Sequence, residues 1–477
     1  MLQPILYIAV FLIELAILAT VQSRAVRQIS LLLASYVLYL TWQPWFFAVL
    51  LASTLMNYGF GELLRRKPSA AMLWTGLLLN LGLLGTFKYL PPVAMRLPSS
   101  LQPLAHLALP LGMSFWTFQA MSYLFDIYRE EEIDPSLVEF ALYMAFFPVT
   151  ISGPICRMPD MLPQFRSEER VPWPERLPGL SRIATGVLMM QLAKLLGHGI
   201  FGGDGIASGF DRATHWSGAD VWCLAIGYGL QLFFDFAGYS HIAIGAAQAL
   251  GFTVPENFAR PFASKSPSVF WTRWHMSLSF WIRDYVFLPL ATARRELWWR
   301  NSALVISMVV FGVWHKASWL FVLWGCYHGV LLVLHRQVQQ LERRMDWNPP
   351  EGLWNLASWA ATMLLVSLGW IFFRANSLAQ ARQMLSSMTA LGSYSSRLLD
   401  GSLYLLVAAL AIGYAIVLRA TEALERHSVQ PASGALSVLA QKKWYWVPAL
   451  YTFLLLVVLL ITQTQGPTAA QFMYRTF

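Results

Sequence analysis

Residues 302–335 of the chain read SALVISMVVFGVWHKASWLFVLWGCYHGVLLVLH. The run is apolar almost throughout, and it is longer than the about 20 residues that one helix needs to cross a bilayer. It therefore predicts two membrane helices, or one helix and a re-entrant piece. His315 and His328 lie inside the run. Ionisable residues are costly in a membrane interior, so both histidines are candidates for a functional site.

Comparable apolar runs occur along the rest of the sequence. Hydrophobic residues make up 57% of the 477 residues and charged residues only 12%, about half the charged fraction of soluble domains. Too little polar surface remains to cover a water-soluble globule. We therefore predict an all-α polytopic integral membrane protein with about 11 membrane helices. The predicted spans lie near 4–21, 29–41, 45–60, 71–87, 106–127, 137–155, 180–200, 219–251, 302–335, 354–373, 402–418 and 444–463.

Two of these runs allow more specific predictions about the helices that they form. The run 219–251 also exceeds one bilayer thickness, so it predicts two helices, or a helix and a re-entrant piece. The first run is interrupted by Glu14 and has no basic residue before it, which favours a membrane helix over a cleaved signal peptide.

The cysteines Cys156, Cys223 and Cys326 are widely separated and predict packed thiols, not a disulfide framework or a metal motif.

Basic residues exceed acidic ones, with 34 Lys and Arg against 25 Asp and Glu. They gather in short loops beside the apolar runs, a pattern that orients membrane proteins and attracts anionic lipid. We therefore expect membrane lipids, not nucleic acid, as the partners of most of these charges. Beyond residue 130, charged loops follow consecutive runs, so the loops do not alternate between sides. This predicts an irregular centre with backbone buried inside protein.

Residues 252–301 are basic and aromatic. Their apolar side chains recur at the spacing of an amphipathic helix, at Phe270, Trp271, Trp274, Leu278 and Trp281. Such a segment could lie at the membrane interface. The polar residues between the aromatic ones, His275 among them, favour the wall of a site.

Histidine is the side chain best suited to proton transfer near neutral pH. His275 and His315 could converge on one cavity, with His328 as a weaker candidate. Asp235 is a carboxylate inside an apolar run. The alternatives are a structural role for each buried histidine and helix pairing for Asp235. No spacing of these residues predicts a metal site.

A series of motifs runs through most of the chain: FKY 87–89, LPLGMSFWTFQ 109–119, FFP 146–148, GPI 153–155, DFAGYS 235–240, PENF 255–258, FWTRWHMSL 270–278, WIRDY 281–285, WH 314–315, FVLWG 321–325 and GWIFFRA 369–375. In their order and content they resemble the membrane-bound O-acyltransferase (MBOAT) superfamily. Within it, the resemblance is to the bacterial branch that contains the membrane subunit of alginate O-acetyltransferase.

The resemblance implies one MBOAT-like domain, 1–477, with N-terminal helices at 1–130, a catalytic core at 131–335 and C-terminal helices at 336–477. It implies a ring of helices and re-entrant segments around a central tunnel. The position of His315 is the essential histidine of the family, and that of His275 is its usual partner. Other residues expected to contact the donor or line the tunnel are Arg273, Trp274, Ser277, Arg283, Asp284, Tyr285, Trp314, Lys316, Trp319, His328 and Asp235.

The chain departs from the family pattern at two places. Lys316 stands where the family usually has glycine. It could face the site and favour a neutral imidazole, or it could point to solvent or to a phosphate of the donor. Residues 291–295 replace a usual Gly-Gly-Asn run, so no donor contact is transferred to them.

The resemblance implies an O-acetyltransferase of the bacterial inner membrane. It would move an acetyl group from acetyl-CoA to an alginate- or cellulose-like exopolysaccharide, directly or through a periplasmic SGNH-type partner, beside a polysaccharide synthase. No tightly bound cofactor is expected. Arginines at 273, 283, 294, 295 and 300 would bind donor phosphates or anchor the chain. The alternatives are D-alanyl transfer from a carrier protein to teichoic acid, a transporter or flippase with a proton relay, and an inactive scaffold.

Overall fold

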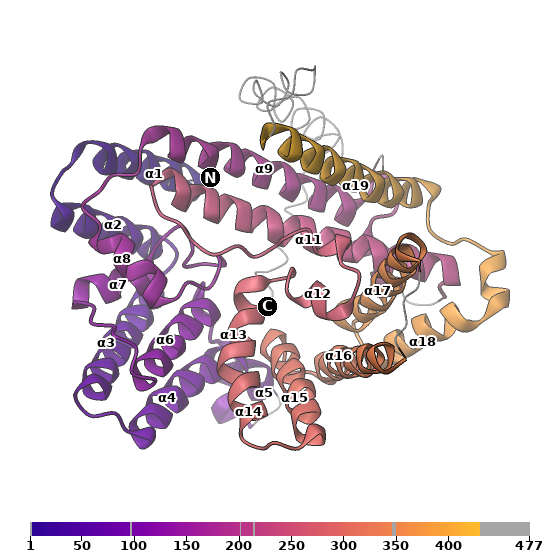
Figure 1. Ribbon diagram of the computed structural model, residues 1–477, viewed down its shortest axis with the longest axis horizontal. Helices are drawn as coiled ribbons and strands as arrows, with labels where there is room; N and C mark the ends of the chain where they lie inside the picture. Colours follow the sequence, from indigo (N-terminus) through magenta and orange to yellow (C-terminus); the bar gives the residue numbers. More distant parts are fainter. Residues whose placement is uncertain (1, 96–97, 201, 213–214, 346–349, 430–477) are drawn as a thin grey trace. The chain divides into compact units, whose positions relative to one another are not determined.

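The computed structural model describes residues 2–95, 98–200, 202–212, 215–345 and 350–429 (Figure 1). Within these ranges the backbone forms helices joined by turns, with no strand and one isolated β-bridge between Phe258 and Trp274. The prediction of an all-α chain is confirmed for this part of the sequence.

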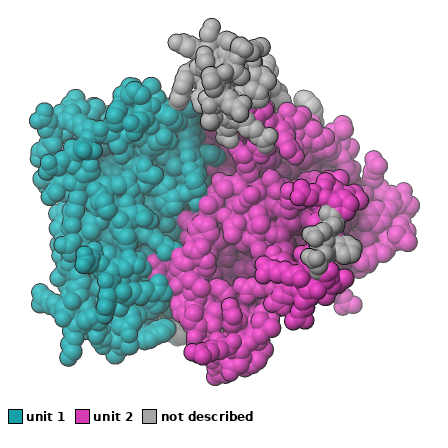
Figure 2. Space-filling model, viewed as in Figure 1, with its two compact units in different colours: residues 1–183, 240–257 teal, residues 184–239, 258–477 magenta. Residues whose placement is uncertain are grey.

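The chain divides into two compact units, which Figure 2 shows in different colours. Unit 1 holds Met1–Ile183 and Ser240–Asn257, and unit 2 holds Ala184–Tyr239 and Phe258–Phe477. Two long helices, α9 (Trp173–His198) and α11 (Gly218–Ala249), contribute residues to both units. The single domain with internal boundaries after residues 130 and 335 stays a prediction.

Unit 1 is built mainly from helices that precede α9. One contact that joins them is a reciprocal pair of buried amides: Asn57 donates to Asn80 over 3.1 Å, and Asn80 donates back over 2.7 Å. Such side-chain pairs hold membrane helices together where apolar surfaces give no preference over lipid. The helices are α1 Leu2–Thr20, α2 Arg24–Leu40, α3 Pro44–Arg66, α4 Ala70–Lys88, α5 Leu90–Ala94, the 3-10 helix η1 Ser99–His106, α6 Met113–Tyr128, α7 Leu137–Ala145 and α8 Met158–Arg166.

Besides its parts of α9 and α11, unit 2 contains α10 and the helices that follow α11. It begins with short elements and continues with long apolar helices. They are α10 Ile206–Asp211, the 3-10 helix η2 Pro261–Ala263, α12 Pro267–Trp271, α13 Met276–Ile282, the π-helix η3 Arg283–Phe287, α14 Leu288–Thr292, α15 Leu297–His315, α16 Trp319–Arg344, α17 Glu351–Arg374, α18 Leu378–Thr389, the 3-10 helix η4 Leu391–Ser395 and α19 Gly401–Val429.

Seven helices of the described residues are long and apolar enough to cross a membrane. They are Pro44–Arg66, Ala70–Lys88, Gly218–Ala249, Leu297–His315, Trp319–Arg344, Glu351–Arg374 and Gly401–Ala423. A shorter apolar helix, Ile5–Thr20, lies at the first predicted span. The predicted span 444–463 lies outside the described residues, and the count of about 11 stays a prediction. The run 302–335 forms two helices, one of the two arrangements predicted for it.

The prediction for 219–251 is wrong, because this run forms the single 32-residue helix α11. The argument from bilayer thickness assumes that lipid surrounds a helix. In α11, 83% of the apolar stretch is buried inside the protein, so protein contacts set its length. In unit 2, Gly238 lets α11 approach α9 closely: an added Cβ there would lie 2.8 Å from the Gly186 carbonyl oxygen.

The predicted span 137–155 is also wrong. Helix α7 ends at Ala145, and Phe146 and the residues up to 157 run in turns and loop, nearly all of them buried. Pro148 disfavours helical backbone in the residue before it. Hydrogen bonds satisfy the buried turn: Tyr143 donates to the Cys156 carbonyl over 3.0 Å and Thr150 to the Phe146 carbonyl over 2.7 Å. This segment agrees with the expectation of irregular backbone buried within protein.

Candidate active site

Helices α15 and α16 form a tight hairpin that carries His315 at its turn. Glycines let the two backbones come close: a Cβ at Gly312 would lie 2.2 Å from the Phe321 carbonyl oxygen. A Cβ at Gly325 would lie 2.4 Å from the carbonyl oxygen of residue 308. Small residues commonly allow this approach between membrane helices. Helix α15 ends at His315 because Lys316 takes an extended conformation, with φ −156°.

The His315 side chain is enclosed by aromatic rings and is only 5% exposed. It stacks on Phe311, four residues earlier on α15, with centroids 5.5 Å apart. Phe373 of α17 meets it edge-on at 5.0 Å. The rings around it, all within 6.1 Å, belong to Phe311, Trp314, Phe321, Trp324 and Phe373. The imidazole therefore lies in an apolar enclosure.

His275 interrupts the segment that was predicted as one amphipathic helix. Helix α12 ends at Trp271 and α13 begins at Met276, and between them His275 takes the left-handed conformation, with φ 43° and ψ 53°. The prediction of continuous helical periodicity across this segment is wrong at His275. The five apolar side chains on which that prediction rested are nevertheless buried: Phe270, Trp271, Trp274, Leu278 and Trp281.

The backbone on both sides of His275 is held by hydrogen bonds. The Ala259 N–H donates to the Arg273 carbonyl over 3.0 Å, and the Ser279 N–H donates to the His275 carbonyl over 2.8 Å. The Ser279 hydroxyl also donates to the Trp274 carbonyl over 2.9 Å. A non-glycine residue in the left-handed region costs about 1–3 kcal/mol and persists where its surroundings determine it. These bonds are such surroundings.

The His275 ring lies in the same group of aromatic residues as His315. It is 1% exposed, and Phe236 of α11 meets it edge-on at 4.6 Å. Phe311 and Trp314 lie 6.2 and 6.3 Å from it, and both also contact His315. We call His275, His315, Phe311 and Trp314 the histidine cluster. The structure brings the two histidines into this cluster, and their catalytic roles stay predictions.

His328 lies behind this cluster and is also buried, at 1% exposure. Its ring contacts Trp324 at 5.0 Å and Trp271 at 5.1 Å. Trp324 also contacts His315, so one indole separates the two imidazoles. His328 Nε2 has no hydrogen-bond partner among the described residues. A Cβ at Gly369 would lie 2.4 Å from this nitrogen, so α17 closes tightly over it.

Three further predicted site residues are buried. Asp235 is 7% exposed and directly precedes Phe236, whose ring contacts His275. Trp274 is 5% exposed, and its ring lies 5.0 Å from that of Trp370. Ser277 lies in the first turn of α13 and is 7% exposed. These residues belong to the core that surrounds His275.

The predicted donor-binding residues at 283–285 point in different directions. The Arg283 side chain is 54% exposed, and its Nε donates to the neighbouring Asp284 carboxylate over 2.7 Å. Tyr285 is buried, with its ring 5.1 Å from that of Trp281. Arg273 is half-buried. The local ion pair holds Arg283 at the protein surface, outside the histidine cluster.

Lys316 and Trp319 follow His315 but lie at the surface. Lys316 is exposed and Trp319 is 73% exposed. The exposure of Lys316 agrees with the expectation that it points to solvent or to a donor phosphate. Neither residue is part of the enclosure around His315, and their contact with a donor stays a prediction.

Sequence reasoning missed the phenylalanines that bring the histidines together. Phe311 stands four residues before His315 and so shares a helix face with it, a signal that was available. Phe236 and Phe373 stand in recognised motifs, but only the folded chain shows that they face the imidazoles. Within the described ranges, no group of three or more His, Cys, Asp or Glu residues is placed to hold a metal ion.

Three relatives illustrate what this chain is similar to. The probable alginate O-acetylase AlgI of Pseudomonas putida is 34% identical over 384 residues, which is 77% of this chain and 76% of the relative. The peptidoglycan O-acetyltransferase of Helicobacter pylori is 30% identical over 435 residues, 82% of this chain and 78% of the relative. The teichoic acid D-alanyltransferase of Bacillus subtilis is 29% identical over 278 residues, 55% of this chain and 68% of the relative.

The model of the membrane-bound O-acyltransferase family, MBOAT, matches residues 18–373. This range includes the histidine cluster, five of the seven helices that are long and apolar enough to cross a membrane, and all but the last residue of a sixth, Glu351–Arg374. The family match, the relatives and these apolar helices all indicate a membrane acyltransferase. The chain belongs to the membrane-bound O-acyltransferase family and is a multi-pass membrane acyltransferase.

Proposed function

We propose that this protein transfers an acetyl group from acetyl-CoA to a hydroxyl group of a cell-envelope polysaccharide, and that it works in the bacterial inner membrane. The observation that carries the proposal is the histidine cluster, in which two buried imidazoles share Phe311 and Trp314 as neighbours. The names of the alginate O-acetylase and peptidoglycan O-acetyltransferase relatives support an acetyl group and an envelope-polymer acceptor.

His315 acts as the general base in this proposal. It takes the proton from the attacking hydroxyl, and the oxygen forms a bond to the thioester carbonyl carbon. The tetrahedral intermediate then collapses, the carbon–sulfur bond breaks, and the thiolate of coenzyme A receives the proton. General-base catalysis of this kind contributes about 100- to 10,000-fold to the rate.

His275 orients the thioester or assists the proton transfer. Its backbone is fixed in an unusual conformation by hydrogen bonds on both sides, so the direction of its ring is set before any substrate binds. A catalytic group whose position is determined in advance loses little entropy during the reaction. The strained backbone of His275 therefore supports a positioning role for its side chain.

The aromatic enclosure protects the acyl donor. A thioester is easily hydrolysed, and a site that excludes water favours transfer to the intended hydroxyl. The five rings around His315 form such a site. Buried Asp235, Trp274 and Ser277 extend its wall beside His275.

The α15–α16 hairpin separates the basic residues from His315. Arg300 lies near the start of α15, and Arg343 and Arg344 lie at the end of α16. With a rise of 1.5 Å per residue, Arg300 and His315 are about 22 Å apart along the helix. Coenzyme A carries its acyl group on a long flexible arm, away from its phosphates. We therefore place the phosphates at the Arg294, Arg295 and Arg300 end and the thioester at His315.

The acetyl group crosses the membrane in this proposal, through a tunnel within a ring of about 11 helices. Its acceptor is either the polysaccharide itself or a periplasmic SGNH-type partner that works beside the polysaccharide synthase. Purified protein in proteoliposomes, supplied with acetyl-CoA and de-O-acetylated polysaccharide, separates the two routes. Ester formation on the polymer without any partner indicates direct transfer.

The test of the proposal is the O-acetyl content of the envelope polysaccharide, measured by NMR. A deletion strain is complemented with wild type, His315→Ala, His275→Ala or the exposed control His106→Ala, at matched membrane levels. We expect wild type and His106→Ala to restore acetylation and His315→Ala to fail. Normal acetylation by His315→Ala would refute the assignment of the base.

The same spectra distinguish D-alanyl transfer, which the teichoic acid relative performs by name. A D-alanyl ester shows the α-proton and methyl signals of the amino acid, whereas an acetyl ester shows one methyl singlet. Restored D-alanyl esters without acetyl esters would replace acetyl-CoA by an aminoacyl donor and leave the histidine assignments in place.

A further inference from the structure

Arg336, in the second half of α16 in unit 2, is a positive charge that is fixed by an aromatic ring. It is half-buried, and its side chain forms no hydrogen bond or ion pair with the described residues. Its guanidinium carbon lies over the Phe287 ring at the end of η3, 5.5 Å from the ring centroid. A guanidinium stacked on a ring gains cation–π attraction, and its five N–H groups lie in its own plane. Arg336 is therefore held in place without using these donors on protein acceptors.

A second arginine, just before α15, is held in the same way. The Arg294 guanidinium carbon lies 4.9 Å from the centroid of the Trp299 ring, and Trp299 Nε1 donates to the Leu290 carbonyl over 2.7 Å. The helix runs without a break from Phe287 in η3 to Leu290 in α14, so these two residues are neighbours on one helix face. The rings beneath Arg336 and Arg294 are thus anchored within one helical turn of each other.

The packing of α16 against α15 adds a third arginine to this region. The two helices run antiparallel, and a Cβ at Gly329 would lie 2.7 Å from the Val305 Cα. Continuing this register toward the start of α15 brings Arg336 level with residue 298, within one turn of Arg300. Arg300 is exposed and forms no side-chain hydrogen bond or ion pair with the part of the chain that the structure describes. One end of the hairpin therefore presents three arginines without acidic partners.

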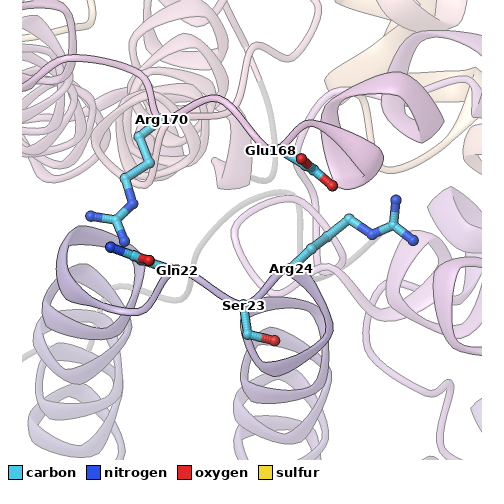
Figure 3. A pocket seen from close by; sticks show the side chains of 5 residues that line it. All are labelled: Gln22, Ser23, Arg24, Glu168 and Arg170. Atoms are coloured by element: carbon cyan, nitrogen blue, oxygen red, sulfur yellow. The ribbon is translucent and has the colours of Figure 1, made fainter.

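The arginines beside a recess of about 720 Å³ in unit 1 are arranged differently (Figure 3). Arg170 donates to the carbonyls of residues 19 and 20 over 2.9 and 3.1 Å, so its guanidinium already has protein acceptors. It points away from Arg24, the other arginine of the lining. The difference in unit 2 is that aromatic rings fix Arg294 and Arg336 and leave their N–H groups to another partner.

We propose that Arg294 and Arg336 bind the 3′-phosphate of coenzyme A, the phosphate farthest from the thioester. This assignment rests on the function proposed above, in which coenzyme A carries the acetyl group and places its phosphates at this end of the α15–α16 hairpin. Along coenzyme A the thioester is followed by the pantetheine arm, the diphosphate and the ribose 3′-phosphate. Arg336 is about 26 Å from His315 along the hairpin, slightly farther than Arg300. The order of the arginines thus matches the order of the phosphates.

A terminal phosphate suits a pair of fixed arginines. A phosphate monoester carries a charge of about −1.5 to −2 at neutral pH and has three strong acceptor oxygens. The planar fork of arginine can donate two parallel hydrogen bonds to such a group. A phosphopantetheine arm on a carrier protein lacks the 3′-phosphate. Arg294 and Arg336 would therefore select a free coenzyme A thioester over a carrier-bound acyl group.

The experiment compares the binding of coenzyme A and 3′-dephospho-coenzyme A. Isothermal titration calorimetry is carried out on the full chain in a neutral detergent. We expect wild type to bind coenzyme A at least about tenfold more tightly than the dephospho form. Arg336→Gln should weaken coenzyme A binding about tenfold and leave the affinity for the dephospho form unchanged. Equal affinities in wild type, or equal losses for both ligands in Arg336→Gln, would overturn the assignment.

Two further variants separate stacking from general electrostatic attraction. Phe287→Leu keeps an apolar side chain beneath Arg336 but removes the ring, and it should weaken coenzyme A binding severalfold without affecting the dephospho form. The matched control is Arg24→Gln, which removes an exposed arginine of unit 1 and should leave both affinities unchanged. An equal loss of coenzyme A binding in Arg24→Gln and Arg336→Gln would contradict the proposal. If Arg336→Gln does not fold, Arg294→Gln repeats the test.

Phosphatidylglycerol, compared with phosphatidylcholine, tests whether the arginines bind a lipid headgroup instead. A preference for coenzyme A over its dephospho form that persists in micelles with either lipid supports the 3′-phosphate site. A preference that phosphatidylglycerol abolishes would assign the arginines to lipid.

The acetyl-transfer assay tests the proposed function separately. Selective binding of coenzyme A without any ester on the polysaccharide would support the phosphate site and contradict the proposed function. Equal KM values for acetyl-CoA and its 3′-dephospho form, with normal ester formation, would overturn the phosphate site alone.

Discussion

Glu139 in unit 1 and His315 in unit 2 are both buried, but their surroundings are opposite in kind. Glu139 accepts hydrogen bonds from Arg166 over 2.9 and 3.0 Å and from the Ser136 N–H over 2.8 Å. Arg166 in turn pairs with Asp134. His315 is enclosed by five aromatic rings. Ion pairs and hydrogen bonds surround Glu139, whereas aromatic rings surround His315.

The difference shows that a strongly shifted pKa does not by itself make a group catalytic. Burial opposes the ionisation of Glu139, but the hydrogen bonds from Arg166 and Ser136 outweigh it and lower the pKa to about 2. A carboxylate so far from neutral pH is a poor proton carrier, because general acid–base groups work best near the operating pH. Glu139 therefore stabilises the fold through its charge, whereas the histidine cluster is suited to chemistry.

The largest expected effect is on the rate of acetyl transfer, which should distinguish His315 from Glu139. His315→Ala lowers the rate of acetyl transfer at least about 100-fold, because the general base is lost. Glu139→Gln leaves the rate per folded molecule within about twofold. Both are measured as ester formation in proteoliposomes with equal amounts of folded protein. Equal losses for the two variants would show that Glu139 and His315 do not differ in their importance for acetyl transfer.

The second effect is on the free energy of unfolding, which should also distinguish Glu139 from His315. Glu139→Ala lowers the free energy of unfolding by about 2 kcal/mol, because Arg166 and the start of α7 lose a charged hydrogen-bond partner. His315→Phe keeps an aromatic ring in the enclosure and costs less than about 1.5 kcal/mol. Chemical denaturation in mixed micelles measures both. A larger loss for His315→Phe would show that polar bonds of the imidazole also hold the fold.

A third, smaller effect tests how tightly α17 packs against His328. Gly369→Ala places a methyl group against His328 Nε2, only 2.4 Å away, and costs about 1–2 kcal/mol through overpacking. The control is Gly352→Ala in the same helix, where an added Cβ meets nothing within 4 Å. Unfolding of the two variants in the same micelles gives the comparison. Equal stability would mean that His328 moves aside freely.

The last effect is a pH dependence that belongs to unit 1. The pKa of Glu139 falls from 4.5 to about 2 on folding, so its contribution to stability is present above pH 4.5 and lost as the pH falls toward 2. Wild type should therefore lose more unfolding free energy than Glu139→Gln between about pH 5 and pH 3. Parallel losses over this range would assign the acid sensitivity to other carboxyl groups.

Much of the fold follows from the apolar runs, but two of the predicted spans were wrong for different reasons. Residues 302–335 form two helices, which was one of the two arrangements predicted for them. For 219–251 the same rule failed, because α11 is covered mostly by protein and not by lipid. For 137–155 it failed because Pro148 ends regular structure in a buried segment. Hydropathy measures the cost of leaving water, and it does not distinguish a lipid environment from a protein interior.

The candidate site was predictable in its residues but not in its geometry. Polar groups inside apolar runs pointed to His275 and His315, and the motifs around them pointed to the family. The left-handed conformation of His275 was not predictable, because non-glycine residues seldom adopt it. The contact of Phe236 with His275 joins positions far apart in the sequence, and such tertiary contacts leave no periodic signal.

The tight α15–α16 hairpin has a consequence for biosynthesis. Only residues 316–318 separate the two helices, and glycines at 312, 325 and 329 bring their backbones into contact. Helices that already pair can leave the translocon together, since each shields the other's polar groups from lipid. His315, at the turn, thus enters the bilayer already flanked by Phe311, Trp314, Phe321 and Trp324. The proposed site at His315 can therefore be partly assembled within one hairpin, before α17 supplies Phe373.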